Sequence, residues 1–90
     1  MEQEINTQVQ NELLVFAELA YMLEIARKKH PVFARTAFDA ADVINAEIDE
    51  LYNAIDHESE ERQREEALDV AVTALRFVLE EHKKKSVDKV

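Results

Sequence analysis

Residues 40–56 read AADVINAEIDELYNAID, which is the pattern of an amphipathic helix. At 100° per residue, one side of this helix collects apolar residues and the other side collects polar residues. The apolar side comprises Ala40, Val43, Ile44, Ile48, Leu51, Ala54 and Ile55. The polar side comprises Asp42, Asn45, Asp49, Asn53 and Asp56. The stretch therefore predicts a surface helix with one buried face.

Two acidic residues break this pattern. Glu47 and Glu50 do not fall on the polar side but project among Ala40, Val43 and Leu51. Burying an acid without a partner is costly. Their position therefore predicts that these two carboxylates have a function.

Residues that break or cap helices divide the chain into three predicted helices. Pro31 disfavours a helical residue before it, and Ser59 has the chemistry of an N-cap. We expect helices over about 5–29, 34–56 and 59–84, the second beginning near Phe33 or Thr36. The chain has no glycine, one proline and no cysteine, which argues against β-hairpins, phosphate-binding glycine loops and disulfides. We therefore predict an all-α fold, with residues 1–90 forming a single domain.

The first predicted helix is apolar nearly all round between Leu13 and Ala26, interrupted by Glu18 and Glu24. A helix that is apolar on every side is normally buried on every side. Three helices in a 90-residue chain cannot surround one of their own number. The sequence therefore predicts a homo-oligomeric helical bundle, either a dimer or a tetramer built as a dimer of dimers.

The charge balance limits the partners. Twenty acidic residues against eleven lysines and arginines give a net charge of -9. Such a surface repels nucleic acid and anionic membranes, so we expect neither as a partner. The first ten residues, MEQEINTQVQ, lack the basic and apolar regions of a secretion signal. We expect a cytoplasmic location.

A second acidic pair follows on the third predicted helix. Glu66 and Asp69, like Glu47 and Glu50, are three residues apart and therefore share a helix face. The Glu66 pair either faces solvent or borders the groove into which the first pair points. Four carboxylates brought together repel one another unless a cation lies between them. Because Mg²⁺ prefers oxygen ligands, the two pairs predict a metal site.

These segments resemble a known family. The run AEIDELYNAI over 46–55, followed by EEALDVAVTALRFV over 65–78, is similar to the MazG-like nucleotide pyrophosphohydrolases of the all-α NTP pyrophosphatase superfamily. The family signature is E-E-x-x-E, a spacer and then E-x-x-D. The segment KKHPVFARTAFDAADVINAEIDEL resembles the short phage and bacterial branch. The resemblance covers about Lys28 to Val78.

The resemblance implies roles for the four acids. Glu47 and Glu50 match the second and last glutamates of the first motif, and Glu66 and Asp69 match the second motif. These positions bind Mg²⁺ in the family, so the resemblance implies Mg²⁺ as the cofactor here, and we keep Mn²⁺ as the alternative ion. The first glutamate of the family motif is replaced by Ala46 here.

The implied activity is metal-dependent hydrolysis of a nucleoside triphosphate to a nucleoside monophosphate and pyrophosphate. A carboxylate that the metal does not fully use would accept the proton of the attacking water. Glu47 and Glu50 are the two catalytic candidates, and the sequence does not choose between them. Candidate phosphate contacts are Arg76, Lys28, Lys29, Arg35 and the lysines at 83–85. Candidate aromatic walls for the base are Phe16, Tyr21, Phe33 and Phe38.

A rival prediction belongs to another class of protein. The same apolar faces would serve a non-catalytic oligomerisation or regulatory module, and Ala46 would mark a degenerate metal site. The three histidines lack the spacing of a zinc site, so we expect structural or solvent-exposed roles for them.

Overall fold

The computed structural model describes residues 2–83, with side-chain surroundings described for residues 6–83. Over this range the chain forms three α-helices, α1 (Glu2–Lys29), α2 (Ala37–His57) and α3 (Glu60–Val78), and no strand. The predicted all-α class is confirmed. None of the described helices is long and apolar enough to cross a membrane.

The helix boundaries are set by local hydrogen bonds. The Thr36 hydroxyl accepts a 3.0 Å bond from the Asp39 amide and caps α2. The Ser59 hydroxyl accepts a 3.2 Å bond from the Arg62 amide and caps α3. These caps satisfy amides that have no partner within their own helix. The Ser59 cap agrees with the sequence prediction, and Thr36 is the correct alternative for the start of α2.

The third helix ends earlier than the sequence predicts. We expected it to reach about residue 84, whereas α3 ends at Val78 and a turn follows through residues 79–82. Glu80 adopts a left-handed backbone conformation with φ 61°, which a continuous helix does not allow. The turn brings Glu81 back toward α1 and α3, where it pairs with two arginines. Lys84 lies outside the described residues.

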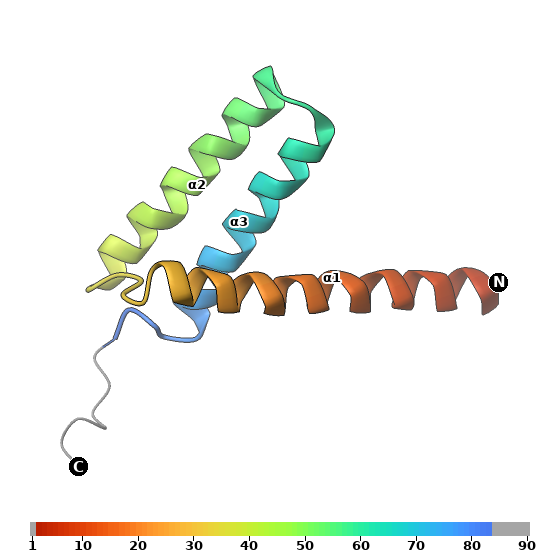
Figure 1. Cartoon of the computed structure of the whole chain (residues 1–90), viewed down its shortest axis with the longest axis horizontal. Coiled ribbons are helices and arrows are strands. Elements are labelled where there is room, and N and C mark those ends of the chain that lie inside the picture. The colour runs from red at the N-terminus through yellow and green to blue at the C-terminus, as the bar shows by residue number, and fades with distance from the viewer. Residues whose placement is uncertain (1, 84–90) are drawn as a thin grey trace, which may run out of the picture.

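The helices form a hairpin crossed by a longer helix. α2 and α3 pack along each other as an antiparallel pair, and α1 packs across α3 (Figure 1). The N-terminal half of α1 extends beyond the hairpin (Figure 1). The buried apolar residues are Leu23, Phe33, Ala40, Ala54 and Val72. Two of these five are alanines, so the apolar core of the described chain is small.

Candidate metal centre and adjoining pocket

Three carboxylates from two helices meet at the seam of the hairpin. Glu47 comes from α2, and Glu66 and Asp69 come from adjacent turns of α3. One oxygen from each of the three side chains lies within 4.8 Å of the others. The structure thus brings three of the four predicted metal ligands together.

Glu66 is the most buried member of this group. Only 6% of the residue is exposed. Its Oε1 accepts a 2.5 Å hydrogen bond from Arg62 Nη2. Its Oε2 is buried and has no hydrogen-bond partner among the described residues. A buried carboxylate oxygen without a partner is rare because its desolvation is not compensated. A cation bound beside Asp69 and Glu47 would compensate it.

Burial, and after it repulsion between the carboxylates, raises the pKa of all three acids. Burial, together with the charges of Glu50, Asp69 and Glu66, raises the pKa of Glu47 to about 7. Burial and neighbouring carboxylates also raise the pKa of Glu66 and of Asp69. Arg62 opposes the increase at both of these acids. The cluster therefore disfavours full ionisation of its own carboxyls, which a bound cation would favour.

Glu50 lies at the edge of this group. The sequence placed it on the apolar side of its helix, but the structure shows an exposed residue. It is 60° around α2 from Glu47, away from the seam that Ala40 and Ala54 bury. Its charge still raises the pKa of Glu47, Glu66 and Asp69. Glu50 is therefore close enough to act on the cluster from the solvent side.

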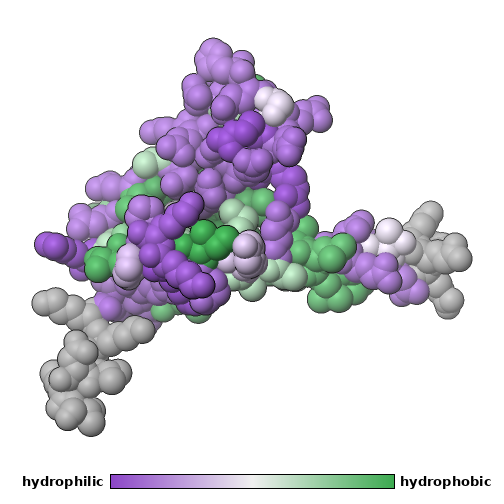
Figure 2. All heavy atoms as spheres, viewed as in Figure 1, coloured by the Kyte–Doolittle hydropathy of each residue, from purple (hydrophilic) through white to green (hydrophobic). Residues whose placement is uncertain are grey.

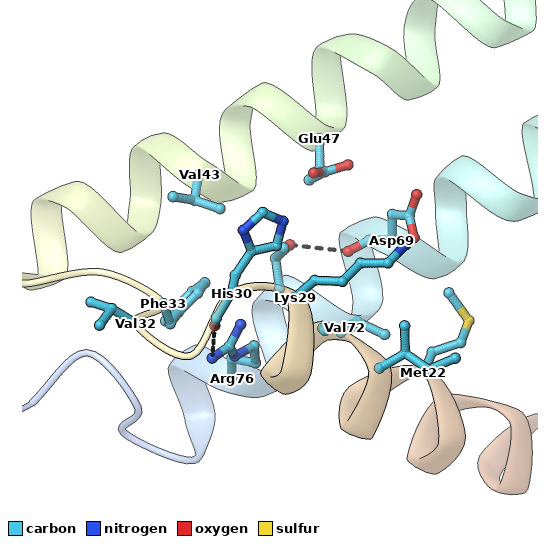
Figure 3. A pocket seen from close by; sticks show the side chains of 13 residues that line it. Met22, Lys29, His30, Val32, Phe33, Val43, Glu47, Asp69, Val72 and Arg76 are labelled. Atoms are coloured by element: carbon cyan, nitrogen blue, oxygen red, sulfur yellow. Dashed lines mark hydrogen bonds between the residues drawn. The ribbon is translucent and has the colours of Figure 1, made fainter.

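A pocket of about 610 Å³ adjoins two of the three carboxylates. Glu47 and Asp69 lie at one side of it, and Lys29 extends toward Asp69 (Figure 3). The Lys29 charge opposes the rise in the pKa of Asp69. The apolar wall of the pocket consists of Met22, Ile25, Ala26, Val32, Phe33, Val43 and Val72. The site thus combines carboxylates, a cation and an apolar wall, contributed by all three helices and the loop between α1 and α2.

Arg76 forms the far side of the pocket. It is one of the candidate phosphate contacts named from the sequence, and only 3% of the residue is exposed. Its Nη2 donates a 2.9 Å bond to the His30 carbonyl (Figure 3), and its guanidinium lies 5.0 Å from the ring centroid of Phe33. Its Nε donates a 2.7 Å bond to Glu81 Oε1. These contacts hold the buried guanidinium in place at the pocket.

Glu81 joins Arg76 to α1. Its Oε2 accepts bonds from Arg27 Nε and Nη2 at 2.9 and 2.5 Å. Burial opposes ionisation of Glu81, but the hydrogen bonds from Arg27 and Arg76 outweigh it, so the pKa lies below its usual value. Sequence reasoning missed this network because the Arg27 bond spans 54 positions and Glu81 was placed within a continuous helix. No periodic pattern signals such a contact.

The other predicted phosphate ligands do not all reach the pocket. Lys29 lines it, whereas Lys28 and Arg35 are exposed and lie outside it. Of the four candidate aromatic walls, Phe33 lines the pocket. The other three, Phe16, Tyr21 and Phe38, are exposed elsewhere. Lys84 and Lys85 lie outside the described residues.

The histidines take structural or solvent-exposed positions. His30 is exposed at the pocket, and His57 is exposed at the end of α2. His82 is buried and stacks on Phe77 with ring centroids 4.5 Å apart. Its Nδ1 finds no partner in the part of the chain that the structure describes.

Comparison with protein-family models, with curated proteins and with solved structures finds no match for this chain.

Proposed function

We propose that this protein is a Mg²⁺-dependent nucleoside triphosphate pyrophosphohydrolase of the MazG-like type. The observation that carries the proposal is the meeting of Glu47, Glu66 and Asp69 beside a pocket with apolar and cationic walls. The order of the two acidic motifs in the sequence supports the same activity. We place the activity in the cytoplasm and in a homo-oligomer, as the sequence predicts.

The carboxylate cluster fits a divalent cation. Three hard oxygen ligands lie within 4.8 Å of one another, and the free Glu66 Oε2 is buried among them. Glu47, Glu66 and Asp69 would hold Mg²⁺ or Mn²⁺, and Glu50 would complete the set from the exposed edge. When bound, the ion would neutralise phosphate charge and lower the pKa of a coordinated water.

The pocket fits the remainder of a nucleotide. Its volume of about 610 Å³ is that of a small-molecule site. The apolar wall, with the buried ring of Phe33, would take the base. Lys29 is exposed beside Asp69 and would contact the phosphates. Arg76 is already held by Glu81 and the His30 carbonyl, so its charge would act on the phosphates without leaving these partners.

The reaction requires one proton transfer. A water oxygen bonds to the α-phosphorus, the bond from that phosphorus to the bridging oxygen breaks, and pyrophosphate leaves. The water proton passes to a carboxylate. Glu47 and Glu50 remain the two candidates for this acceptor. Glu47 lies inside the cluster and Glu50 at its exposed edge, where a carboxylate that is not a ligand would remain free.

A second function has one observation in its favour. Arg62 pairs with Glu66 and also with Glu65 and Glu58, so the chain itself neutralises part of the cluster. A metal site that no longer binds its ion would show an arginine on a former ligand, as Arg62 pairs with Glu66 here, and the loss of a glutamate, as at Ala46. Such a degenerate site would belong to a non-catalytic module. The two functions differ in their response to metal.

Thermal unfolding with and without Mg²⁺ separates the two functions. Binding to the folded state alone stabilises it by about 2.7 kcal/mol at a hundredfold excess over Kd. We expect stabilisation of the wild type and none of the Glu66→Gln plus Asp69→Asn variant. Asp49→Asn, which removes an exposed acid of α2, is the matched control and should respond like the wild type.

Turnover is tested by pyrophosphate release from a panel of ribo- and deoxynucleoside triphosphates. We expect Mg²⁺-dependent release by the wild type and by Asp49→Asn, and loss of release in Glu47→Gln. Metal binding without turnover of any nucleotide would refute the enzyme and favour the degenerate module. Indifference to metal would refute the metal centre itself.

A further inference from the structure

Arg62, in the first turn of α3, contacts the carboxylate cluster without being a candidate ligand. It lies one helical turn before Glu66, and its Nη2 donates the 2.5 Å bond to Glu66 Oε1. The Arg62 side chain is 45% exposed, whereas that of Glu66 is 8% exposed. Arg62 therefore contacts the buried carboxylate from the solvent side.

Two further acids hold Arg62 in this position. Its Nη1 donates to Glu65 Oε2, and its Nε lies 3.8 Å from Glu58 Oε1. Neither acid belongs to the cluster of Glu47, Glu66 and Asp69. Hydrophilic residues gather over this end of the hairpin, at the top of Figure 2. The guanidinium thus has partners that keep it beside Glu66 when a cation occupies the cluster.

The two oxygens of Glu66 have different surroundings. Oε1 is bonded to Arg62, whereas Oε2 is buried and has no partner among the described residues. A carboxylate that binds a metal through both oxygens must turn both toward the ion. A guanidinium on Oε1 uses that oxygen and places a positive charge next to it. While Arg62 stays in place, Glu66 can therefore give a cation one oxygen, Oε2.

The number of available oxygens separates one divalent cation from another. Ca²⁺ takes about six to eight oxygens and often binds a carboxylate through both of its oxygens. Mg²⁺ takes an octahedral set and keeps several waters. Glu47, Glu66 and Asp69 each offer one oxygen within 4.8 Å of the others. Three single oxygens with retained waters suit Mg²⁺, whereas Ca²⁺ would gain from a second oxygen of Glu66.

We propose that Arg62 is a specificity-determining residue of the metal centre, which favours Mg²⁺ over Ca²⁺ by holding Glu66 to a single ligating oxygen. The inference rests on the metal centre of the proposed function and assigns a role to a residue that is not a ligand. The contact between Arg62 and Glu66 leaves Oε2 without a protein partner. It therefore limits how Glu66 binds a cation and does not remove Glu66 from the site.

Thermal-shift titrations of the metal-free protein with MgCl₂ and with CaCl₂, in the absence of nucleotide, give the ratio of the two Kd values. The wild type should bind Mg²⁺ more tightly than Ca²⁺. In Arg62→Gln the preference for Mg²⁺ should fall roughly tenfold, because Ca²⁺ gains the second oxygen of Glu66. Lys29→Gln is the matched control. It removes a positive charge that extends toward Asp69 (Figure 3) and frees no oxygen of Glu66.

The control separates ligand geometry from charge. Mg²⁺ and Ca²⁺ carry the same charge, so the loss of a nearby positive charge should raise both affinities alike and leave their ratio unchanged in Lys29→Gln. A wild type that Mg²⁺ stabilises, with the same ratio in Arg62→Gln, would refute the inference alone. A wild type that neither ion stabilises would refute the metal centre and the inference together.

Infrared spectroscopy tests the binding mode itself. The gap between the antisymmetric and symmetric carboxylate stretching bands is smaller when both oxygens bind one ion than when a single oxygen binds it. Difference spectra between the Ca²⁺-bound and metal-free protein should contain bands with the smaller gap in Arg62→Gln and lack them in the wild type. Identical difference spectra for the two proteins would overturn the proposal.

Discussion

Replacing Glu47 by glutamine should stabilise the metal-free protein at neutral pH. Burial and three neighbouring carboxylates raise the pKa of Glu47 from its ordinary value of 4.5 to about 7. Below about pH 4.5 the carboxyl is protonated in both the folded and the unfolded state, so it resembles the amide of glutamine. Between about pH 4.5 and 7 the unfolded chain releases this proton and the folded chain retains it. The free energy of unfolding of the wild type therefore falls as pH rises through this window.

The expected size follows from the shift. Each pKa unit corresponds to about 1.36 kcal/mol, so the shift sets an upper value of about 3 kcal/mol at pH 7.5. Partial exposure of Glu47 reduces this to about 2 kcal/mol. The free energy of unfolding of Glu47→Gln should equal that of the wild type below about pH 4.5. It should exceed the wild-type value by the full amount above about pH 7.

Urea unfolding in EDTA, followed by circular dichroism across this pH range, measures the difference. Asp49→Asn controls for the loss of an exposed acid from α2 and should follow the wild type. Saturating Mg²⁺ should reverse the ranking, because the ion stabilises the wild type and not the variant. A difference that stays constant with pH, or a Glu47→Gln protein less stable than the wild type at neutral pH in EDTA, would refute the electrostatic reasoning.

Three further outcomes are expected. Arg76→Met leaves the half-buried Glu81 with Arg27 as its remaining partner and should cost about 3 kcal/mol in urea unfolding. Arg35→Met, at an exposed position, should change stability by less than about 0.5 kcal/mol. A cost below about 1 kcal/mol for Arg76→Met would contradict the network. Thr36→Ala and Ser59→Ala should each lower the free energy of unfolding by about 1 kcal/mol, because each removes a helix cap. Thr36→Ser should restore the stability. No loss in either alanine variant would mean that the caps do not stabilise the helices. Val43→Phe narrows the pocket and should weaken nucleotide binding about tenfold, a change of about 1.4 kcal/mol in binding free energy, in a thermal-shift titration. Stabilisation by Mg²⁺ should persist, and Ile55→Phe, at an exposed position of α2, is the control. Unchanged binding by Val43→Phe would place the nucleotide elsewhere.

The helices were predictable because their signals are local. Thr36 and Ser59 are the N-caps of α2 and α3. The apolar side of α2 contains Ala40 and Ala54, which are both fully buried. The end of α3 was predicted too late. Its apolar pattern continues through Leu79, whereas the turn after Val78 brings Glu81 to Arg27 of α1 and Arg76 of α3.

The candidate site was predictable as a set of residues but not as a geometry. Spacing alone placed Glu47 and Glu50 together on the apolar side of α2 and left Glu66 undecided between solvent and groove. In the structure Glu66 is buried and Glu50 is exposed. The reason is that the packing of α3 against α2 buries Glu66, half-buries Glu47 and Asp69, and leaves Glu50 in solvent. A helical wheel contains no information about that packing.

The Glu81 bridge has a consequence for the order in which the chain assembles. The α2–α3 hairpin depends on contacts between neighbouring helices, whereas the bonds from Glu81 to Arg27 join residues 54 positions apart. Contacts between distant positions form late, because a long loop must close first. During synthesis α1 leaves the ribosome first, yet its bridge to the end of α3 cannot form until residue 81 has emerged. We therefore expect the bridge from α1 to Glu81 to be one of the last contacts to form during folding.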